Sequence, residues 1–443
     1  MEDDRNWDER REYRRRRRVR SQIMAYAVVG IFLAAMAAGA VFGIGVISDR
    51  IKEKKQAEEL ARQLEEMSQE EEAIVGTPVS MEGTAAEEAA EETDWLEELV
   101  AATIEEMPLE DKVAGLFMIT PEALTGVGQA IQAGEGTSQA LEKYAVGGLI
   151  YFGQNIQSRE QLTEMLANTR SMSKYPLFLA VDEEGGKIRR VGGSSIEVPE
   201  VGDMWNIGES GDSAQAYEAG STLGSYLYEL GFDVDFAPVA DLVADPDDSA
   251  VGRRAFGGDP ALVGEMAAAA ADGIQAAGVS ACLKHFPGIG AAAEDTHEGM
   301  VVLEKSAEEL KASELAAFQP GIAGGVHLVM VGHVSVPAVA GDNTPASLSE
   351  EMITGLLRGE LGYTGIVITD AMNMAAITEY YSSGDAAVMA LKAGADMILM
   401  PEDFREAYEG VLAAVKEGVI AEERVNESLK RIYRVKYRNS LEE

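Results

Sequence analysis

Short apolar runs alternate with longer amphipathic patterns over most of the chain. The runs are VAGLFMIT (113–120), VGGLIYF (146–152), PLFLAVDEE (176–184), FDVDFAPVADL (232–242), VSACLKHF (279–286), HLVMVGHV (327–334), GIVITDAM (365–372) and ADMILMP (395–401). Between the runs, apolar residues recur every three or four positions, which is typical of helices with one buried face. Near-continuous apolar strands indicate a parallel sheet covered on both faces. These eight units predict an α/β fold, a (β/α)8 TIM-type barrel, with an open doubly wound sheet as the alternative.

The N-terminal part follows a different pattern. Residues 23–47 carry no charge over a length that exceeds the roughly 20 residues of a membrane-spanning helix. A cleaved signal peptide is the rival, but its apolar region is shorter, about 7 to 15 residues. The arginine-rich tail 1–22 precedes the span, and an excess of arginine marks the cytoplasmic side. We therefore expect a single-pass protein of a bacterial cell membrane, with its N-terminus cytoplasmic and the rest outside.

Residues 48–93 separate this span from the repeating units. The first part is rich in Glu, Lys, Gln and Ala, with apolar residues at helical spacing, and predicts a helical stalk. From residue 73 the chain mixes Gly, Pro, Ser, Thr and Glu, which indicates a flexible linker. The folded domain is expected to occupy 94–443.

Charge and cysteine content narrow the function classes. The formal net charge of -39 would repel a nucleic-acid backbone, so we exclude nucleic acid as a partner. The single cysteine, Cys282, cannot form an internal disulfide and lies in an apolar run, where a small buried side chain is expected.

Ionisable residues follow most of the predicted strands. They are Asp182, Glu183, Glu184, Asp241, Lys284, His285, His333 and Asp370. In a barrel the active site forms at the carboxyl ends of the strands, so these side chains would face one mouth. Taken singly, an Asp after a strand often caps a helix and a lone His is often a core residue. Their number at one rim favours a site.

The segment KHFPGIGAAAEDTHEG, residues 284–299, carries the densest chemistry. In an extended segment Asp295 and His297 share a face, so the carboxylate could orient the imidazole for proton exchange with a substrate. A metal site is the sharper rival. The four histidines include no close pair such as HxH or HExxH, and we predict neither metal nor cofactor.

Several motifs occur here in the order found in glycoside hydrolase family 3. They are AVDEEGG, LGFDVDFAPVADL, RRAFGGDP, CLKHFPGIG, EDTH, ITDAMNM and AGADMILMP. The resemblance covers about residues 105–435, and the Asp-x-His loop is similar to that of the single-domain β-N-acetylglucosaminidase branch. The resemblance implies a retaining glycosidase that forms a covalent glycosyl-aspartate intermediate.

By this resemblance the site residues can be assigned. Asp370 would be the nucleophile, and His297 with its partner Asp295 would be the acid/base. The residues implied in sugar binding are Asp182, Arg254, Lys284, His285 and His333. Arg253 is the alternative to Arg254.

The chain departs from the family pattern at two places. Ile289 stands where that branch commonly has a histidine, and Ala255 stands where it has a serine. Neither change removes the nucleophile or the acid/base, so activity is still expected.

The implied function is a membrane-anchored exo-β-N-acetylglucosaminidase that acts outside the membrane on peptidoglycan-derived or related glycans. The alternatives are a β-N-acetylglucosaminide phosphorylase, a β-glucosidase and a non-catalytic sugar-binding protein.

Overall fold

The computed structural model describes residues 84–247, 249–290 and 299–441. By its internal contacts the chain divides into two units, 1–86 and 87–443, and the second contains the folded domain. In the described ranges no helix combines the length and the apolar character that crossing a bilayer requires. The predicted span 23–47, the tail 1–22 and most of the stalk lie outside the described residues, and their predictions stay untested.

Eight parallel strands form the centre of the second unit. They are β1 (Phe117–Ile119), β2 (Gly148–Tyr151), β3 (Phe178–Val181), β6 (Val234–Asp235), β7 (Ser280–Phe286), β8 (Leu328–Val331), β9 (Ile366–Thr369) and β10 (Ile398–Leu399). Each of the predicted apolar runs contains one of them. The order in the sheet is β10-β1-β2-β3-β6-β7-β8-β9, with every residue of these strands buried.

The sheet closes on itself between its first and last strands. Ile368 of β9 pairs in parallel with Met397, just before β10, and the Thr369 amide donates to the Met397 carbonyl at 3.1 Å. An open doubly wound sheet would leave these two edges apart. The predicted barrel is therefore confirmed, and the open alternative is wrong.

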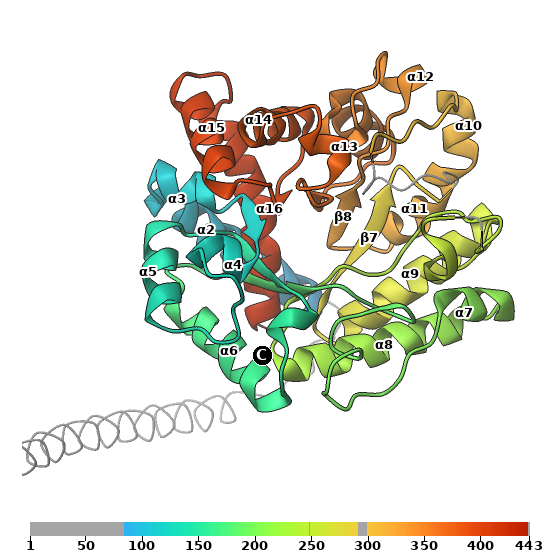
Figure 1. Ribbon diagram of the computed structural model, residues 1–443, viewed down its shortest axis with the longest axis horizontal. Helices are drawn as coiled ribbons and strands as arrows, with labels where there is room; N and C mark the ends of the chain where they lie inside the picture. The colour runs from blue at the N-terminus through green and yellow to red at the C-terminus, as the bar shows by residue number, and fades with distance from the viewer. Residues whose placement is uncertain (1–83, 248, 291–298, 442–443) are drawn as a thin grey trace, which may run out of the picture. The chain divides into compact units, whose positions relative to one another are not determined.

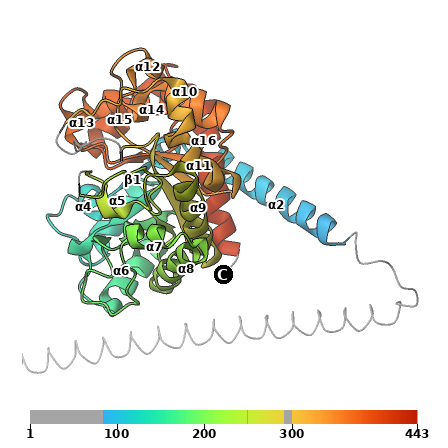
Figure 2. The same cartoon turned by 90° about the vertical axis from the view of Figure 1, so that its right-hand side faces the viewer.

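Helices surround the strands on the outside (Figure 1). They are α2 (Thr84–Glu106), α3 (Leu109–Ala114), α4 (Pro121–Thr125), α5 (Glu135–Lys143), α6 (Arg159–Met172), α7 (Met204–Ser210), α8 (Ser213–Leu230), α9 (Pro260–Ala276), α10 (Ala307–Ala312), α11 (Glu314–Ala323), α12 (Pro337–Ala340), α13 (Ala375–Thr378), α14 (Ser383–Ala393), α15 (Phe404–Lys416) and α16 (Glu422–Leu441). Shorter or irregular turns are η1 (Gly153–Asn155), η2 (Gly252–Arg254), η3 (Ala346–Leu348) and the π-type η4 (Glu351–Glu360). Figure 2 shows the same barrel from the side, with α9 packed between α8 and α11.

Local sequence sets where these helices begin and end. The Asp212 side chain accepts the Ala214 amide and starts α8, and the Asp259 side chain accepts the Leu262 amide and starts α9. Gly231 ends α8 with φ of 96°, a left-handed conformation that glycine adopts without a steric cost. The chain enters β6 shortly afterwards, so this cap determines where α8 ends and where the strand can begin.

Helix α2 runs across the predicted domain start at residue 94. Residues 84–93 were expected to belong to a flexible linker, but they are helical in the structure. The reason lies in their composition, since Ala and Glu are among the strongest helix formers. Within the second unit, Glu97 of α2 pairs with Arg434 of α16 at 2.5 Å.

Candidate active site

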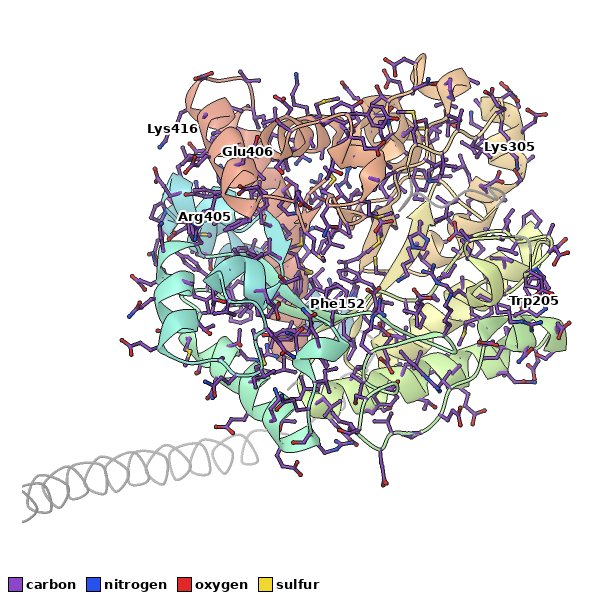
Figure 3. The ribbon with its side chains drawn as sticks, in the orientation of Figure 1. Phe152, Trp205, Lys305, Arg405, Glu406 and Lys416 are labelled. Carbon is purple, nitrogen blue, oxygen red and sulfur yellow. The ribbon has the colours of Figure 1, made fainter. Side chains whose placement is uncertain are left out.

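A cavity of about 450 Å³ lies at the carboxyl ends of the strands. Of the described residues, three carboxylates, three Lys or Arg side chains and one His line it: Asp182, Glu184, Asp370, Arg190, Arg254, Lys284 and His285. The rest of the lining is mostly apolar and includes Phe152, which Figure 3 places near the middle of the barrel face. Polar groups gathered in an otherwise apolar cavity are typical of a small-molecule site.

Lys284 of β7 connects the acidic residues that follow β3. Its Nζ lies 2.8 Å from an Asp182 oxygen and 2.6 Å from Oε1 of Glu184. Arg254, from η2, holds Glu184 with two bonds, from Nε to Oε2 at 2.7 Å and from a terminal nitrogen to Oε1 at 2.8 Å. The planar guanidinium matches the carboxylate fork, so this pair is fixed in direction as well as distance. Lys284, Glu184 and Arg254 form a rigid charged floor that leaves part of Asp182 exposed to the cavity.

These contacts decide the charge of Glu184. Burial opposes ionisation, but Arg254 and Lys284 outweigh it and hold the pKa of Glu184 below its usual range. Burial likewise disfavours the ammonium of Lys284, yet Asp182 and Glu184 raise its pKa. Glu184, Arg254 and Lys284 are therefore ionised together at neutral pH.

His285 is held from behind by Asp241, the residue that follows the β6 region. Its Nδ1 lies 2.7 Å from Oδ2 of Asp241, which is fully buried. The other oxygen of Asp241 accepts the Ile289 amide at 2.7 Å. One carboxylate thus orients the imidazole and also anchors the first residues of the loop after β7. A carboxylate at Nδ1 leaves Nε2 of His285 for the cavity.

Asp370 directly follows β9, and its amide donates to the Val331 carbonyl of β8 at 2.8 Å. One side-chain oxygen accepts the Ala371 amide at 2.7 Å. Burial opposes its ionisation, but His285, His333, the Ala371 amide and Lys284 lower its pKa overall. The cavity therefore holds an ionised carboxylate at this position, as a nucleophile requires.

His333 takes a different place from the other predicted binding residues. It is fully buried, its Nδ1 lies 2.8 Å from the Ser347 hydroxyl, and its Nε2 lies 3.0 Å from the Ala371 carbonyl. It is absent from the lining of the cavity. These contacts make it a support of the segment that carries Asp370, and direct contact with a sugar stays a prediction.

The remaining predicted residues divide into two groups. Asp182, Arg254, Lys284, His285 and Asp370 line one cavity. Arg253 is exposed, so the structure selects Arg254 as the arginine at the cavity. Asp295 and His297 lie outside the described residues, and the acid/base stays a prediction. No three potential ligands gather at a metal-binding distance in the described part of the chain.

Sequence reasoning missed Arg190. It lies on a hairpin formed by β4 (Glu183–Gly185) and β5 (Ile188–Arg189), and it lines the cavity. Its guanidinium lies 5.5 Å from the centre of the Phe152 ring and 4.0 Å from Asp182, and its buried Nε has no hydrogen-bond partner among the described residues. The Arg190 side chain is 33% exposed and lines the cavity, so its guanidinium can bond a polar ligand there. The sequence signal for this residue was the Gly185-Gly186 turn, which is followed by Lys, Ile and two Arg residues within reach of the strand end.

Comparison with known proteins places the barrel in a family. Residues 108–435 match the model of the glycosyl hydrolase family 3 N terminal domain. A beta-hexosaminidase of Stenotrophomonas maltophilia is 38% identical over 279 residues, which are 61% of this chain and 81% of that protein. Beta-hexosaminidase A of Pseudoalteromonas piscicida is 31% identical over 337 residues, 68% of this chain and 54% of that protein.

A solved structure gives the same result. A glycoside hydrolase family 3 beta-N-acetylglucosaminidase from Paenibacillus sp. superposes with a TM-score of 0.71 at 37% identity, covering 76% of this chain and 64% of that chain. The chain spans less than two thirds of the Pseudoalteromonas and Paenibacillus proteins. The family match includes every strand of the barrel and every described residue of the cavity, and the chain belongs to glycosyl hydrolase family 3.

Proposed function

We propose that this barrel is a retaining exo-β-N-acetylglucosaminidase. The observation that carries the proposal is the ionised Asp370 at the cavity, beside Lys284, His285 and the other groups suited to sugar hydroxyls. The beta-hexosaminidase and beta-N-acetylglucosaminidase relatives support the choice of sugar.

The chemistry follows from the roles of two residues. A carboxylate oxygen of Asp370 forms a bond to the anomeric carbon while the glycosidic C–O bond breaks, and His297 gives its proton to the departing oxygen. Water then attacks the same carbon, returns a proton to His297 and releases Asp370. Two inversions leave the sugar with its original β configuration. Asp295 would orient His297 during both steps.

The binding side chains have separate tasks in this proposal. Asp182 accepts from sugar hydroxyls, and Arg190, Arg254 and Lys284 donate to them. Charge-assisted bonds of this kind are roughly twice as strong as neutral ones. The Asp241 carboxylate keeps His285 in one orientation, so that its free nitrogen meets the ring in a fixed direction.

The first experiment follows 4-nitrophenol release from 4-nitrophenyl N-acetyl-β-glucosaminide by the full chain in phosphate-free buffer. Asp370→Ala should lose about 10³-fold or more of the activity, because it removes the group that forms the covalent bond. Asp272→Ala is the matched control, since Asp272 is an exposed carboxylate on α9, outside the barrel. Proton NMR of the first product should show the β anomer.

Three other outcomes separate the alternatives. Release only after phosphate is added would indicate a phosphorylase. Release from the β-glucoside but not from the N-acetyl compound would indicate a β-glucosidase. Binding of N-acetylglucosamine without release from either compound would indicate a non-catalytic sugar-binding protein.

The cellular setting is a further part of the proposal. We place the barrel outside a bacterial cell membrane, held by residues 23–47, where peptidoglycan-derived β-linked N-acetylglucosamine glycosides are the natural substrates. The uncharged span and the arginine-rich tail support this topology. The full chain should stay with membranes after alkaline washing, and protease added to intact spheroplasts should remove the barrel. A chain that begins after residue 47 in the culture medium would instead indicate signal-peptide cleavage.

A further inference from the structure

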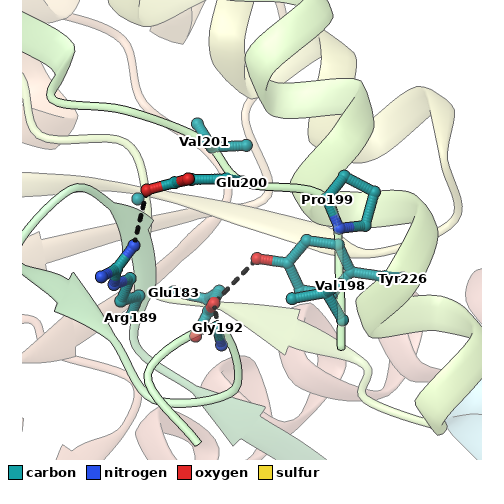
Figure 4. A pocket seen from close by; sticks show the side chains of 9 residues that line it. Glu183, Arg189, Gly192, Val198, Pro199, Glu200, Val201 and Tyr226 are labelled. Atoms are coloured by element: carbon teal, nitrogen blue, oxygen red, sulfur yellow. Dashed lines mark hydrogen bonds and ion pairs between the residues drawn. The ribbon is translucent and has the colours of Figure 1, made fainter. Parts of the chain in front are cut away.

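The hairpin of β4 and β5 separates two cavities. Side chains of adjacent residues on a strand point to opposite faces. Asp182, Glu184, Ile188 and Arg190 therefore line the cavity of about 450 Å³ at the carboxyl ends of the strands, which we call the strand-end cavity. Glu183, Gly185, Arg189 and Gly192 line a second cavity of about 250 Å³ on the other side of the hairpin. We call this second space the outer cavity; Figure 4 shows it. The turn between the strands uses Gly185 and Gly186, with φ of 82° and 50°.

Glu183 is the buried acceptor of the outer cavity. Its Oε1 accepts the Gly192 amide at 2.8 Å and the Tyr226 hydroxyl at 2.8 Å (Figure 4). Its Oε2 accepts the Val191 amide at 2.7 Å. The side chain is fully buried, and no Lys or Arg forms an ion pair with it in the described ranges. Its bonds are therefore directed at two backbone amides and one hydroxyl of α8.

The two amides directly follow Arg190. A carboxylate that holds both of them fixes the backbone on the C-terminal side of Arg190, while the pairing of Glu183 with Arg189 fixes it on the other side. The Tyr226 hydroxyl ties the same carboxylate to α8, so the whole arrangement is attached to the outer helix layer. Arginine has many rotamers, so movement of its backbone would add to the spread of guanidinium positions. A fixed backbone at Arg190 therefore narrows the positions that its guanidinium can take in the cavity.

We propose that Glu183 is a positioning residue that sets the enzyme's affinity for the sugar through the backbone that carries Arg190. The proposal rests on the proposed function, because Arg190 is taken to bind a sugar hydroxyl. Glu183 itself does not touch the substrate. It faces the outer cavity, on the opposite side of the hairpin from Asp370 and Lys284.

A double-mutant cycle tests this role in the full chain. Glu183→Gln keeps the shape but replaces one acceptor oxygen with an amide that faces a backbone N–H. It should raise KM for 4-nitrophenyl N-acetyl-β-glucosaminide about tenfold, with a smaller change in kcat. Arg190→Ala should raise KM at least as much. Adding Glu183→Gln to Arg190→Ala should then change KM no further, because Glu183 acts on the sugar only through Arg190.

Glu200→Gln is the matched control. Glu200 lies on the same side of the hairpin, pairs with Arg189 at 3.3 Å and is exposed, so its loss should leave KM unchanged. Additive effects of Glu183→Gln and Arg190→Ala on KM would overturn the proposal. A lower kcat and a lower melting temperature in Glu183→Gln, with no rise in KM, would also overturn it and would assign Glu183 to general stability.

Hydrogen exchange gives an answer that does not depend on the reaction. In Glu183→Gln the amides of Val191 and Gly192 should exchange faster, with the exchange of the barrel strands unchanged. Unchanged exchange at 191–192 would overturn the positioning role. If the wild-type chain releases no nitrophenol and binds no sugar, the proposed function and the link to affinity both fail, and faster exchange would support only the structural part.

Discussion

The ammonium of Lys284 lies 2.6 Å from the carboxylate of Glu184, and both side chains are only 2% exposed. Neither charge has access to bulk water, so each depends on the other and on Asp182 and Arg254. Breaking a buried pair of this kind leaves a charge without compensation, which costs far more than losing a surface pair. The strand-end cavity is therefore built on charges that also hold the fold together.

Glu184→Gln should lower the free energy of unfolding at pH 7 by about 3 kcal/mol, because it leaves Lys284 and Arg254 with one fewer negative partner. Guanidinium denaturation at pH 7 measures the change. The exposed Glu200→Gln should stay within about 0.5 kcal/mol of the wild type. Equal midpoints for Glu184→Gln and the wild type would show that the pair contributes nothing to stability.

The same variant should change the acid response of the fold. The folded pKa of Glu184 is lowered from an ordinary value of 4.5, so its stabilising contribution is present above that value and is lost as pH falls below it. Glu184→Gln lacks this contribution. Between pH 5 and pH 3 its free energy of unfolding should therefore fall less steeply than that of the wild type.

His285→Gln should move the acidic limb of kcat/KM to higher pH. Burial opposes ionisation of Asp370, and the electrostatic effect of His285 is the first of those that lower its pKa. Without this effect the Asp370 carboxylate takes up its proton at a higher pH, so the proposed nucleophile is ionised over a narrower range. Gln retains a donor for Asp241, which keeps the geometry.

His327→Gln is the control for this measurement. His327 precedes β8 at the opposite end of the barrel, and burial lowers its pKa to about 4, so it carries no charge at neutral pH. Its replacement should leave the acidic limb unmoved. A shift in both variants would point to a general change of the fold.

Arg254→Lys should reduce kcat/KM about 10²-fold. A lysine cannot make the two parallel bonds that Arg254 makes to Glu184, so the floor of the cavity loses its fixed geometry. Steady-state kinetics with 4-nitrophenyl N-acetyl-β-glucosaminide measures the loss. Arg253→Lys, one residue away and exposed, should have no effect. Equal loss in the two variants would contradict the selection of Arg254.

Asp235→Asn should stabilise the protein at neutral pH. Asp235 is fully buried in β6, burial raises its pKa well above 3.8, and its Oδ2 has no hydrogen-bond partner among the described residues. A raised folded pKa means that wild-type stability falls as pH rises above 3.8. The asparagine oxygen can still accept the Glu183 amide, so the gain in melting temperature should be larger at pH 7 than at pH 4. A loss at pH 7 would contradict the expectation.

The apolar runs were sufficient to predict eight βα units, because strands buried on both faces appear as consecutive apolar residues. They did not separate a barrel from an open sheet; the pairing of Ile368 with Met397, which closes the barrel, came from the structure. The ends of those runs also indicated Asp182, Lys284, His285 and Asp370, since parallel strands bring their carboxyl ends to one rim. The functional roles came from the family resemblance, which the comparison with known proteins confirmed at the level of the family.

The tertiary structure alone decided how neighbouring residues divide their tasks. Asp182, Glu183 and Glu184 are consecutive acids, yet Glu183 turns to two amides behind the hairpin while its neighbours bind Lys284, about a hundred positions away in the sequence. The same holds for Arg190, which lines the strand-end cavity while Arg189 lines the outer cavity. Local pattern determines which residues form strands and helices, whereas the partners of a polar side chain depend on which distant segments the closed barrel brings beside it.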